Sequence, residues 1–287
     1  MTGDGNLRGA AFMVASMAGF AAEDAFIKAA ARHMPLGEVV TIVGLVGTLA
    51  FAAMTLRSGQ PLWHPVMRSR PLVVRSALEI AGRLFHALAI TLTPISAASA
   101  ILQASPLVVV AGAALIFGEK VGTRRWLAIL AGFGGVILIL RPGTDGFELL
   151  SLLAVAGTLG FAGRDLATRA APKVLSNLQL GVAGFTMLTI AGAIILAASG
   201  APVLPEARAL ALVAGAAVFA IAGYHALTVA MRTGEIGAVA PFRYTRLVFA
   251  LVVGVMIFGE RPDILTLAGA AIVVVSGLLA LLPGRRS

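Results

Sequence analysis

The chain has 287 residues, of which 59% are hydrophobic and 12% are charged. An ordinary soluble domain carries about 25% charged residues, so this composition excludes a soluble enzyme or a disordered chain and predicts a membrane protein. The net charge is +9, but the Lys and Arg residues do not form a basic tail or block. This argues against a nucleic-acid partner.

Long apolar runs follow one another along the chain, and each is close to the roughly 20 residues that a membrane-spanning helix needs. Helices are expected because lipid offers the backbone no hydrogen bonds. Gly, Pro and charged residues separate the runs. The predicted spans are 9–30, 36–56, 72–92, 95–117, 123–140, 149–170, 178–199, 207–231, 235–258 and 264–282.

The basic residues are shared unequally between the two sides of these ten spans. If the N-terminus is inside, 13 of the 22 Lys and Arg residues lie in cytoplasmic segments, five lie outside and four lie within spans. The positive-inside rule therefore predicts that both termini are cytoplasmic.

The two halves of the sequence repeat each other at a constant offset of 141 in residue number. Residues 95–143 match residues 236–284 without gaps, including the Ile-Phe-Gly-Glu run that ends at Glu119 and at Glu260. Gly19-Phe20-Ala21 recurs at the same offset as Gly160-Phe161-Ala162. The expected domains are therefore two five-helix repeats, residues 1–145 and 146–287.

Five spans per repeat is an odd number, so the second repeat must enter the membrane from the opposite side. Inverted repeats of this kind are characteristic of secondary transporters, with the substrate site between the halves. The predicted fold is an all-α integral membrane protein, with ten transmembrane helices in two inverted-topology five-helix repeats around a central cavity.

Two five-span repeats, each with a Phe-Gly-Glu span followed by a span that closes on Pro-Gly, resemble the drug/metabolite transporter superfamily and its EamA-type members. The resemblance covers essentially the whole chain and includes YddG-type amino-acid exporters. It implies a multi-pass protein of the bacterial inner membrane, with cytoplasmic termini and a central cavity. The cavity would be lined mainly by spans 1, 3, 4, 6, 8 and 9.

Ionisable groups inside spans are costly and therefore mark candidate sites. Glu79, Arg83 and His86 follow at i, i+4 and i+7, on one helix face. They form either a structural Glu79–Arg83 pair or a polar wall in which Arg83 binds a substrate carboxylate. The corresponding face of the second repeat carries Tyr224 and His225.

Span 9 places Arg243, Tyr244 and Arg246 just after Pro241, and span 4 has Gln103 at the position that matches Tyr244. Arginine suits carboxylate or phosphate binding, although arginines near a span end can also reach the interface. The candidate substrate-binding residues are Glu79, Arg83, His86, Gln103, Tyr224, His225, Tyr244 and Arg246.

Asp24 and Asp165 repeat at the same offset, and Arg164 precedes Asp165. Their repetition favours a scaffold role, in which each binds a base or helix end in its own half, over a role in gating.

The leading prediction is a secondary transporter that exports amino acids and related small metabolites by alternating access. The alternatives are a transporter of phosphorylated or nucleotide-linked metabolites and a passive channel. No hydrolase elbow, zinc-protease motif or phosphate loop is present, so no enzyme activity, cofactor or metal site is expected. The expected partners are a small substrate, protons as a coupling ion and the lipid bilayer, whereas the oligomeric state is not predicted.

Overall fold

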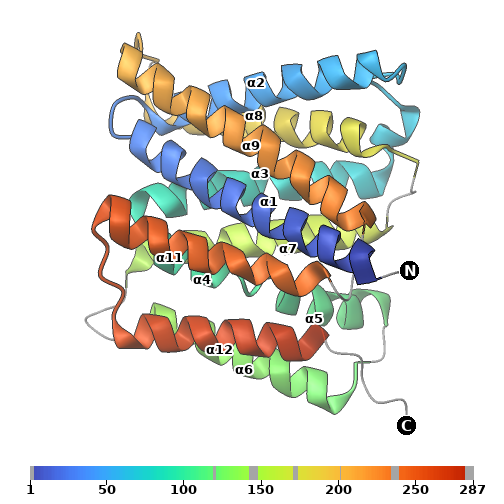
Figure 1. Cartoon of the computed structure of the whole chain (residues 1–287), viewed down its shortest axis with the longest axis vertical. Coiled ribbons are helices and arrows are strands. Elements are labelled where there is room, and N and C mark those ends of the chain that lie inside the picture. Colours follow the sequence, from blue (N-terminus) through green and yellow to red (C-terminus); the bar gives the residue numbers. More distant parts are fainter. Residues whose placement is uncertain are drawn as a thin grey trace.

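The computed structural model is a bundle of α-helices (Figure 1). It describes residues 3–118, 121–141, 148–170, 174–200, 202–233 and 239–281. The first half contains α1 (Gly3–Ala30), α2 (Leu36–Arg57), η1 (Pro65–Arg68), α3 (Arg70–Leu92), α4 (Ile95–Leu102), α5 (Ser105–Phe117) and α6 (Thr123–Leu140). The second half contains η2 (Leu149–Ser151), α7 (Leu152–Ala170), α8 (Asn177–Ser199), α9 (Ala207–Thr233), η3 (Ala240–Tyr244), α11 (Thr245–Phe258) and α12 (Ile264–Leu281). The predicted all-α fold is confirmed over these ranges.

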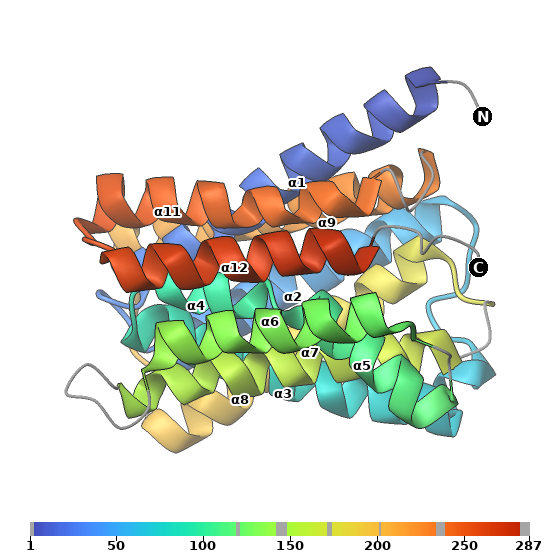
Figure 2. The ribbon, with the colours of Figure 1, turned by 90° about the horizontal axis from the view of Figure 1, so that it is seen from below.

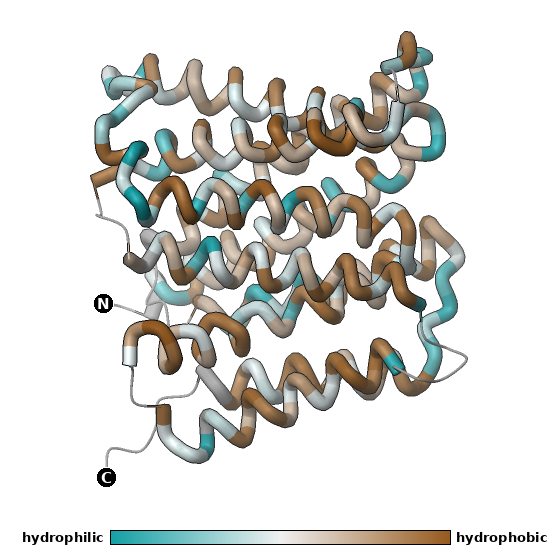
Figure 3. Tube along the Cα trace, turned by 180° about the vertical axis from the view of Figure 1, so that it is seen from behind, coloured by the Kyte–Doolittle hydropathy of each residue, from teal (hydrophilic) through white to brown (hydrophobic). Residues whose placement is uncertain are grey.

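The outer surface of the bundle is apolar. Leu49, Leu115, Leu130 and Met256 each expose well over half of their surface, and Figure 3 shows hydrophobic residues along the helices. In the described ranges, seven helices are long and apolar enough to cross a membrane, and α6 and α12 contain shorter apolar segments. The full count of ten spans stays a prediction.

The helices of the two halves pack against each other rather than form two separate bundles. Helix α1 packs along α9, α3 along α7, α2 along α8 and α6 along α12, so every one of these pairs joins the first half to the second (Figures 1 and 2). The predicted boundary between the domains, after residue 145, lies outside the described residues.

Close contacts between helices depend on glycine. A Cβ atom on Gly160 would lie 2.5 Å from the Gly82 nitrogen, so α7 and α3 approach backbone to backbone. At the offset of 141, Gly160 corresponds to Gly19 and Gly82 to Gly223. This second pair brings α1 close to α9 in the same way, with 3.0 Å between a Cβ on Gly19 and the Gly223 Cα. Small residues allow such contact because van der Waals packing drives helix association in lipid.

The expected span 95–117 is interrupted. Helix α4 ends at Leu102, and α5 starts at Ser105, with Pro106 in its first turn. Proline lacks an N–H and cannot continue the hydrogen-bond ladder of the preceding helix, so Pro106 accounts for the break. The second half breaks similarly, with η3 ending at Tyr244 before α11.

The glycines of the two Phe-Gly-Glu runs end their helices. Gly118 and Gly259 follow α5 and α11 with φ values of 67° and 66°, in the left-handed region that favours glycine at a helix C-terminus. Glu119 lies outside the described residues, as do Pro142, Gly143, Pro283 and Gly284.

Candidate functional site

A cavity of about 310 Å³ lies among the helices of both halves. Its polar wall comes from α1, α3, the α4–α5 break, α7, α9, η3 and α11. The helix breaks therefore border the cavity, where irregular backbone is tolerated in a membrane protein. Nine of the eleven residues predicted to bind substrate or to carry structural charge line it: Asp24, Arg83, His86, Gln103, Arg164, Asp165, Tyr224, Tyr244 and Arg246.

Asp24 joins three helices in the cavity wall. Arg246 Nη2 of α11 donates to Asp24 Oδ2 at 2.6 Å, and His86 Nε2 of α3 lies 3.1 Å from Asp24 Oδ1. The carboxylate is buried and both of its oxygens are engaged, as a buried charge requires. The sequence predicted a partner from the same half, and His86 is such a partner, whereas Arg246 comes from the other half.

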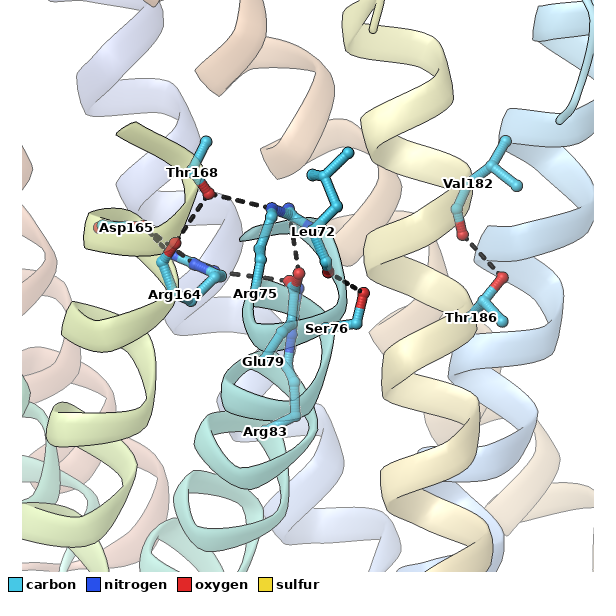
Figure 4. A network of polar contacts seen from close by, with 10 residues as sticks. All are labelled: Leu72, Arg75, Ser76, Glu79, Arg83, Arg164, Asp165, Thr168, Val182 and Thr186. Carbon is cyan, nitrogen blue, oxygen red and sulfur yellow. Dashed lines mark hydrogen bonds and ion pairs between the residues drawn. The ribbon is translucent and has the colours of Figure 1, made fainter. Parts of the chain in front are cut away.

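Glu79 lies behind the cavity wall and is almost fully buried. Three arginines surround it (Figure 4): Arg75 Nη2 lies 3.0 Å from Oε2, and Arg164 Nη1 and Arg83 Nη2 lie 3.5 and 3.9 Å from Oε1. Glu79 therefore holds arginine side chains together, in agreement with the structural alternative, and it does not line the cavity.

Asp165 pairs within its own helix. Its Oδ1 accepts hydrogen bonds from Arg164 Nε at 2.9 Å and from Arg164 Nη2 at 2.8 Å. The Arg164 guanidinium also lies 5.0 Å from the Phe161 ring centroid. The repeated aspartates therefore have different surroundings. In the described part of the chain, Asp24 pairs with His86 and Arg246, whereas Asp165 pairs with Arg164.

The aromatic candidates have different roles in the wall. Tyr224 packs edge to face against Phe51 and Phe185, with ring centroids 5.2 and 5.9 Å away. Among the described residues, the buried Tyr244 hydroxyl has no hydrogen-bond partner. It lies against Gly277, where a Cβ would be only 1.5 Å away.

Two other candidates from the sequence have distinct positions. Gln103 Nε2 donates to the Arg243 carbonyl at 3.1 Å and ties the α4–α5 break to η3. His225 is exposed on α9 and does not line the cavity, unlike its neighbour Tyr224.

Two charged residues of the cavity wall were missing from the predicted site. Glu23 is buried in the wall, beside Asp24 on α1. Arg243 also lines the cavity, so its side chain does not reach for the membrane interface as one interpretation proposed. Both were visible in the sequence as ionisable residues within predicted spans, which was the signal that could have identified them.

The charges of the wall are unequal. Four arginines face three carboxylates, which leaves one positive charge in excess when all are ionised. No carboxylate of the described residues lies within ion-pair distance of Arg243. The described part of the chain also shows no cluster of three or more His, Asp or Glu residues suited to a metal ion. The arrangement favours binding of an anionic group.

Comparisons with known proteins point to transport. The EamA-like transporter family matches residues 7–141 and again residues 148–282. A riboflavin transporter from Rhizobium johnstonii is 31% identical over 64% of this chain and 61% of its own length. An S-adenosylmethionine uptake transporter from Rickettsia prowazekii is 24% identical over 86% of this chain and 81% of its own.

Two further similarities span most of the chain. The pseudopaline exporter CntI of Pseudomonas aeruginosa is 27% identical over 90% of both chains. A solved crystal structure has the same fold, with a TM-score of 0.60 and 18% identity over 93% of this chain and 96% of the other. The relatives named here include an uptake transporter and an exporter, and none of their names specifies an amino acid.

Proposed function

Because the chain belongs to the EamA-like transporter family, we propose that it moves small metabolites with a carboxylate or similar anionic group, amino acids among them, by alternating access. Membership makes it a multi-pass bacterial membrane transporter and not an enzyme. The proposed membrane is the inner one, with both termini in the cytoplasm. The proposed direction is export, which the similarity to the pseudopaline exporter supports.

The proposed architecture is ten spans in two inverted repeats, with the first repeat ending near residue 145. The constant offset between the halves supports this, and so does helix packing that is unchanged when the halves are exchanged. At the offset, α1 corresponds to α7 and α3 to α9, so exchanging the halves converts the α1–α9 pair into the α7–α3 pair. The α2–α8 and α6–α12 pairs are unchanged, because each joins two corresponding helices. Two related halves around one site are the basis of alternating access.

Arg243 is the observation on which the substrate class rests. Its guanidinium offers a planar set of donors that matches a carboxylate, and the described residues leave it without an ion pair. The cavity volume of about 310 Å³ is close to the lower end of the roughly 300–1,000 Å³ of ligand pockets, which favours a small metabolite over a nucleotide.

Counterflow in proteoliposomes tests the proposal, with labelled L-alanine, L-glutamate, riboflavin and S-adenosylmethionine. We expect saturable exchange of an amino acid or a related acid. Arg243→Gln should reduce the affinity by about ten- to a hundredfold, the range for one charge-assisted hydrogen bond pair. Arg57→Gln, on an exposed arginine away from the cavity, is the matched control. Equal affinity in both variants would remove Arg243 from the substrate site.

The four arginines of the cavity also favour a second candidate, a phosphorylated or nucleotide-linked metabolite. Exchange of phosphate esters that is lost when Arg83, Arg243 and Arg246 are each replaced by Gln would support it. A passive channel, the remaining alternative, predicts flux that does not saturate and shows no counterflow.

A further inference from the structure

Arg83 lies between two carboxylates that belong to different helices. Its Nη1 is 4.0 Å from Glu23 Oε1 of α1, and its Nη2 is 3.9 Å from Glu79 Oε1 of α3. Both contacts are at the limit of an ion pair, and the buried Arg83 Nε has no hydrogen-bond partner in the described ranges. Arg83 is therefore loosely held and faces the cavity.

The two carboxylates depend on Arg83 to different degrees. Glu79 keeps Arg75 at 3.0 Å and Arg164 at 3.5 Å when Arg83 moves away. For Glu23, Arg83 is the cation within 4.0 Å in the described part of the chain. A departure of Arg83 would therefore leave Glu23, and not Glu79, as an unpaired buried charge.

In the described part of the chain, no second cation lies within ion-pair distance of Glu23. Its neighbour Asp24 already holds Arg246 and His86, and it adds a like charge. The titratable and charged groups that face the same cavity from the surrounding elements are Asp24 of α1, Arg83 and His86 of α3, Arg164 and Asp165 of α7, Tyr224 of α9, Arg243 and Tyr244 of η3 and Arg246 of α11. A buried carboxylate without a close cation is costly as an anion and becomes neutral when it takes up a proton.

We propose that Glu23 is a proton-binding site coupled to the substrate anion through Arg83, an inference that rests on the proposed function. An anion that binds Arg83 draws this arginine away from Glu23, and Glu23 then takes up a proton from water. The anion and the proton together add no net charge to the cavity. The loaded carrier thereby avoids the cost of an additional charge in the membrane.

The Glu23–Arg83 pair is present in the sequence of only one half of the chain. At the offset that relates the halves, Arg164 corresponds to Glu23 and Tyr224 corresponds to Arg83. A scaffold role would be expected in both repeats, as for the glycine contacts between α1 and α9 and between α3 and α7. This asymmetry favours a function in the transport cycle.

Infrared titration of the purified protein in lipid tests the site without a known substrate. We expect a carboxylic-acid C=O band that disappears as the pH rises between about 5 and 9, the interval in which a buried carboxyl can titrate. Glu23→Gln should lack this band, and Glu38→Gln, which alters a buried carboxyl of α2 that does not line the cavity, should retain it. A band that survives in Glu23→Gln, or a wild type without one, would overturn the proposal.

Acetate, a small carboxylate, serves as the probe for coupling between anion binding and protonation of Glu23. Because linkage is reciprocal, acetate should move the midpoint of the band to higher pH in the wild type. In Arg83→Gln, acetate should leave the midpoint unchanged. An acetate effect that is absent in the wild type, or that persists in Arg83→Gln, would disprove coupling through Arg83.

Transport measurements distinguish failure of the proton site from failure of the proposed function on which it rests. Coupled binding predicts that substrate affinity in the wild type falls by up to about tenfold per pH unit above the midpoint, and stays constant in Glu23→Gln. Saturable counterflow with the same pH dependence in both proteins would refute the proton site and leave the carrier intact. A protein with the titrating band but no counterflow of any panel compound would refute the proposed function.

Discussion

Arg246 of α11 donates to Asp24 of α1 across 2.6 Å, and this buried ion pair joins the second half of the chain to the first at the cavity. Removing one partner of a buried pair leaves an uncompensated charge and costs about 3–5 kcal/mol. We therefore expect Arg246→Gln to lower stability strongly, because Asp24 would keep only His86.

The double variant Asp24→Asn/Arg246→Gln should be more stable than the sum of the single effects predicts, by about 1–3 kcal/mol. Thermal unfolding in detergent, with all four proteins of the cycle, measures this difference. Additive effects would show that the pair is not energetically coupled.

The contact between α3 and α7 requires a glycine at position 160. A Cβ there would lie 2.5 Å from the Gly82 nitrogen and 2.6 Å from its Cα, closer than packed atoms approach. Gly160→Ala should therefore force the helices apart and cost about 1–3 kcal/mol.

Gly134→Ala is the matched control for this substitution. Gly134 is exposed on α6 and a Cβ there meets no atom within 4 Å, so alanine should leave stability unchanged or raise it by up to about 1 kcal/mol. Unfolding curves of Gly160→Ala and Gly134→Ala measure the difference in stability. Equal stability would mean that α3 and α7 accommodate the added methyl group at no cost.

Glu260 caps the start of α4 from the loop that follows α11. It accepts from the Ile95 N–H at 2.6 Å, from the Ser96 N–H at 3.0 Å and from Ser96 Oγ at 2.6 Å, and Lys28 Nζ lies at 3.2 Å. Burial raises the pKa of Glu260, but these hydrogen bonds and the charge of Lys28 outweigh it, so the pKa lies below its ordinary value.

A lowered pKa gives the sign of the pH dependence. The contribution of Glu260 is complete above the pKa of the unfolded chain and is lost as the pH falls through the lower pKa of the folded state. Glu260→Gln should cost about 1–3 kcal/mol near pH 7. The difference from the wild type should shrink in acid, as measured by unfolding from about pH 7 to pH 3.

Asp263, further along the same loop, is the control for this prediction. A hydrogen bond from Arg141 holds its pKa well below the ordinary value, but the carboxylate is about half exposed. Exposed pairs are screened by water, so Asp263→Asn should change stability little at any of these pH values. A loss of stability as large as that of Glu260→Gln would contradict the idea that burial makes Glu260 the more stabilising of the two carboxylates.

The orientation in the membrane is open to a direct test, because the chain contains no cysteine. Leu62→Cys in the connection between α2 and α3 should react with a membrane-impermeant thiol reagent only from the cytoplasmic side. Leu204→Cys in the connection between α8 and α9, where the side chain is almost fully exposed, should react only from outside. The opposite result for both would reverse the assignment from the positive-inside rule.

The class of the protein, the repeat and most helix positions follow from the amino-acid sequence alone. Long apolar runs require helices in lipid, and the constant offset between the halves is independent of tertiary contacts. The ionisable residues within the spans were likewise visible, since their cost in lipid marks them wherever they occur in an apolar run. Spacing placed Arg83 and His86 on one helix face, and both line the cavity.

Which charges meet depends on tertiary packing, because partners far apart in the chain come together only where the two halves pack. Asp24 binds Arg246 of the other half, whereas the repeated Asp165 binds its own neighbour Arg164. A one-residue step along α9 rotates a side chain by about 100°, so Tyr224 faces the cavity while His225 is exposed. Helical spacing relates side chains within a helix, but the face that packs inward depends on its neighbours.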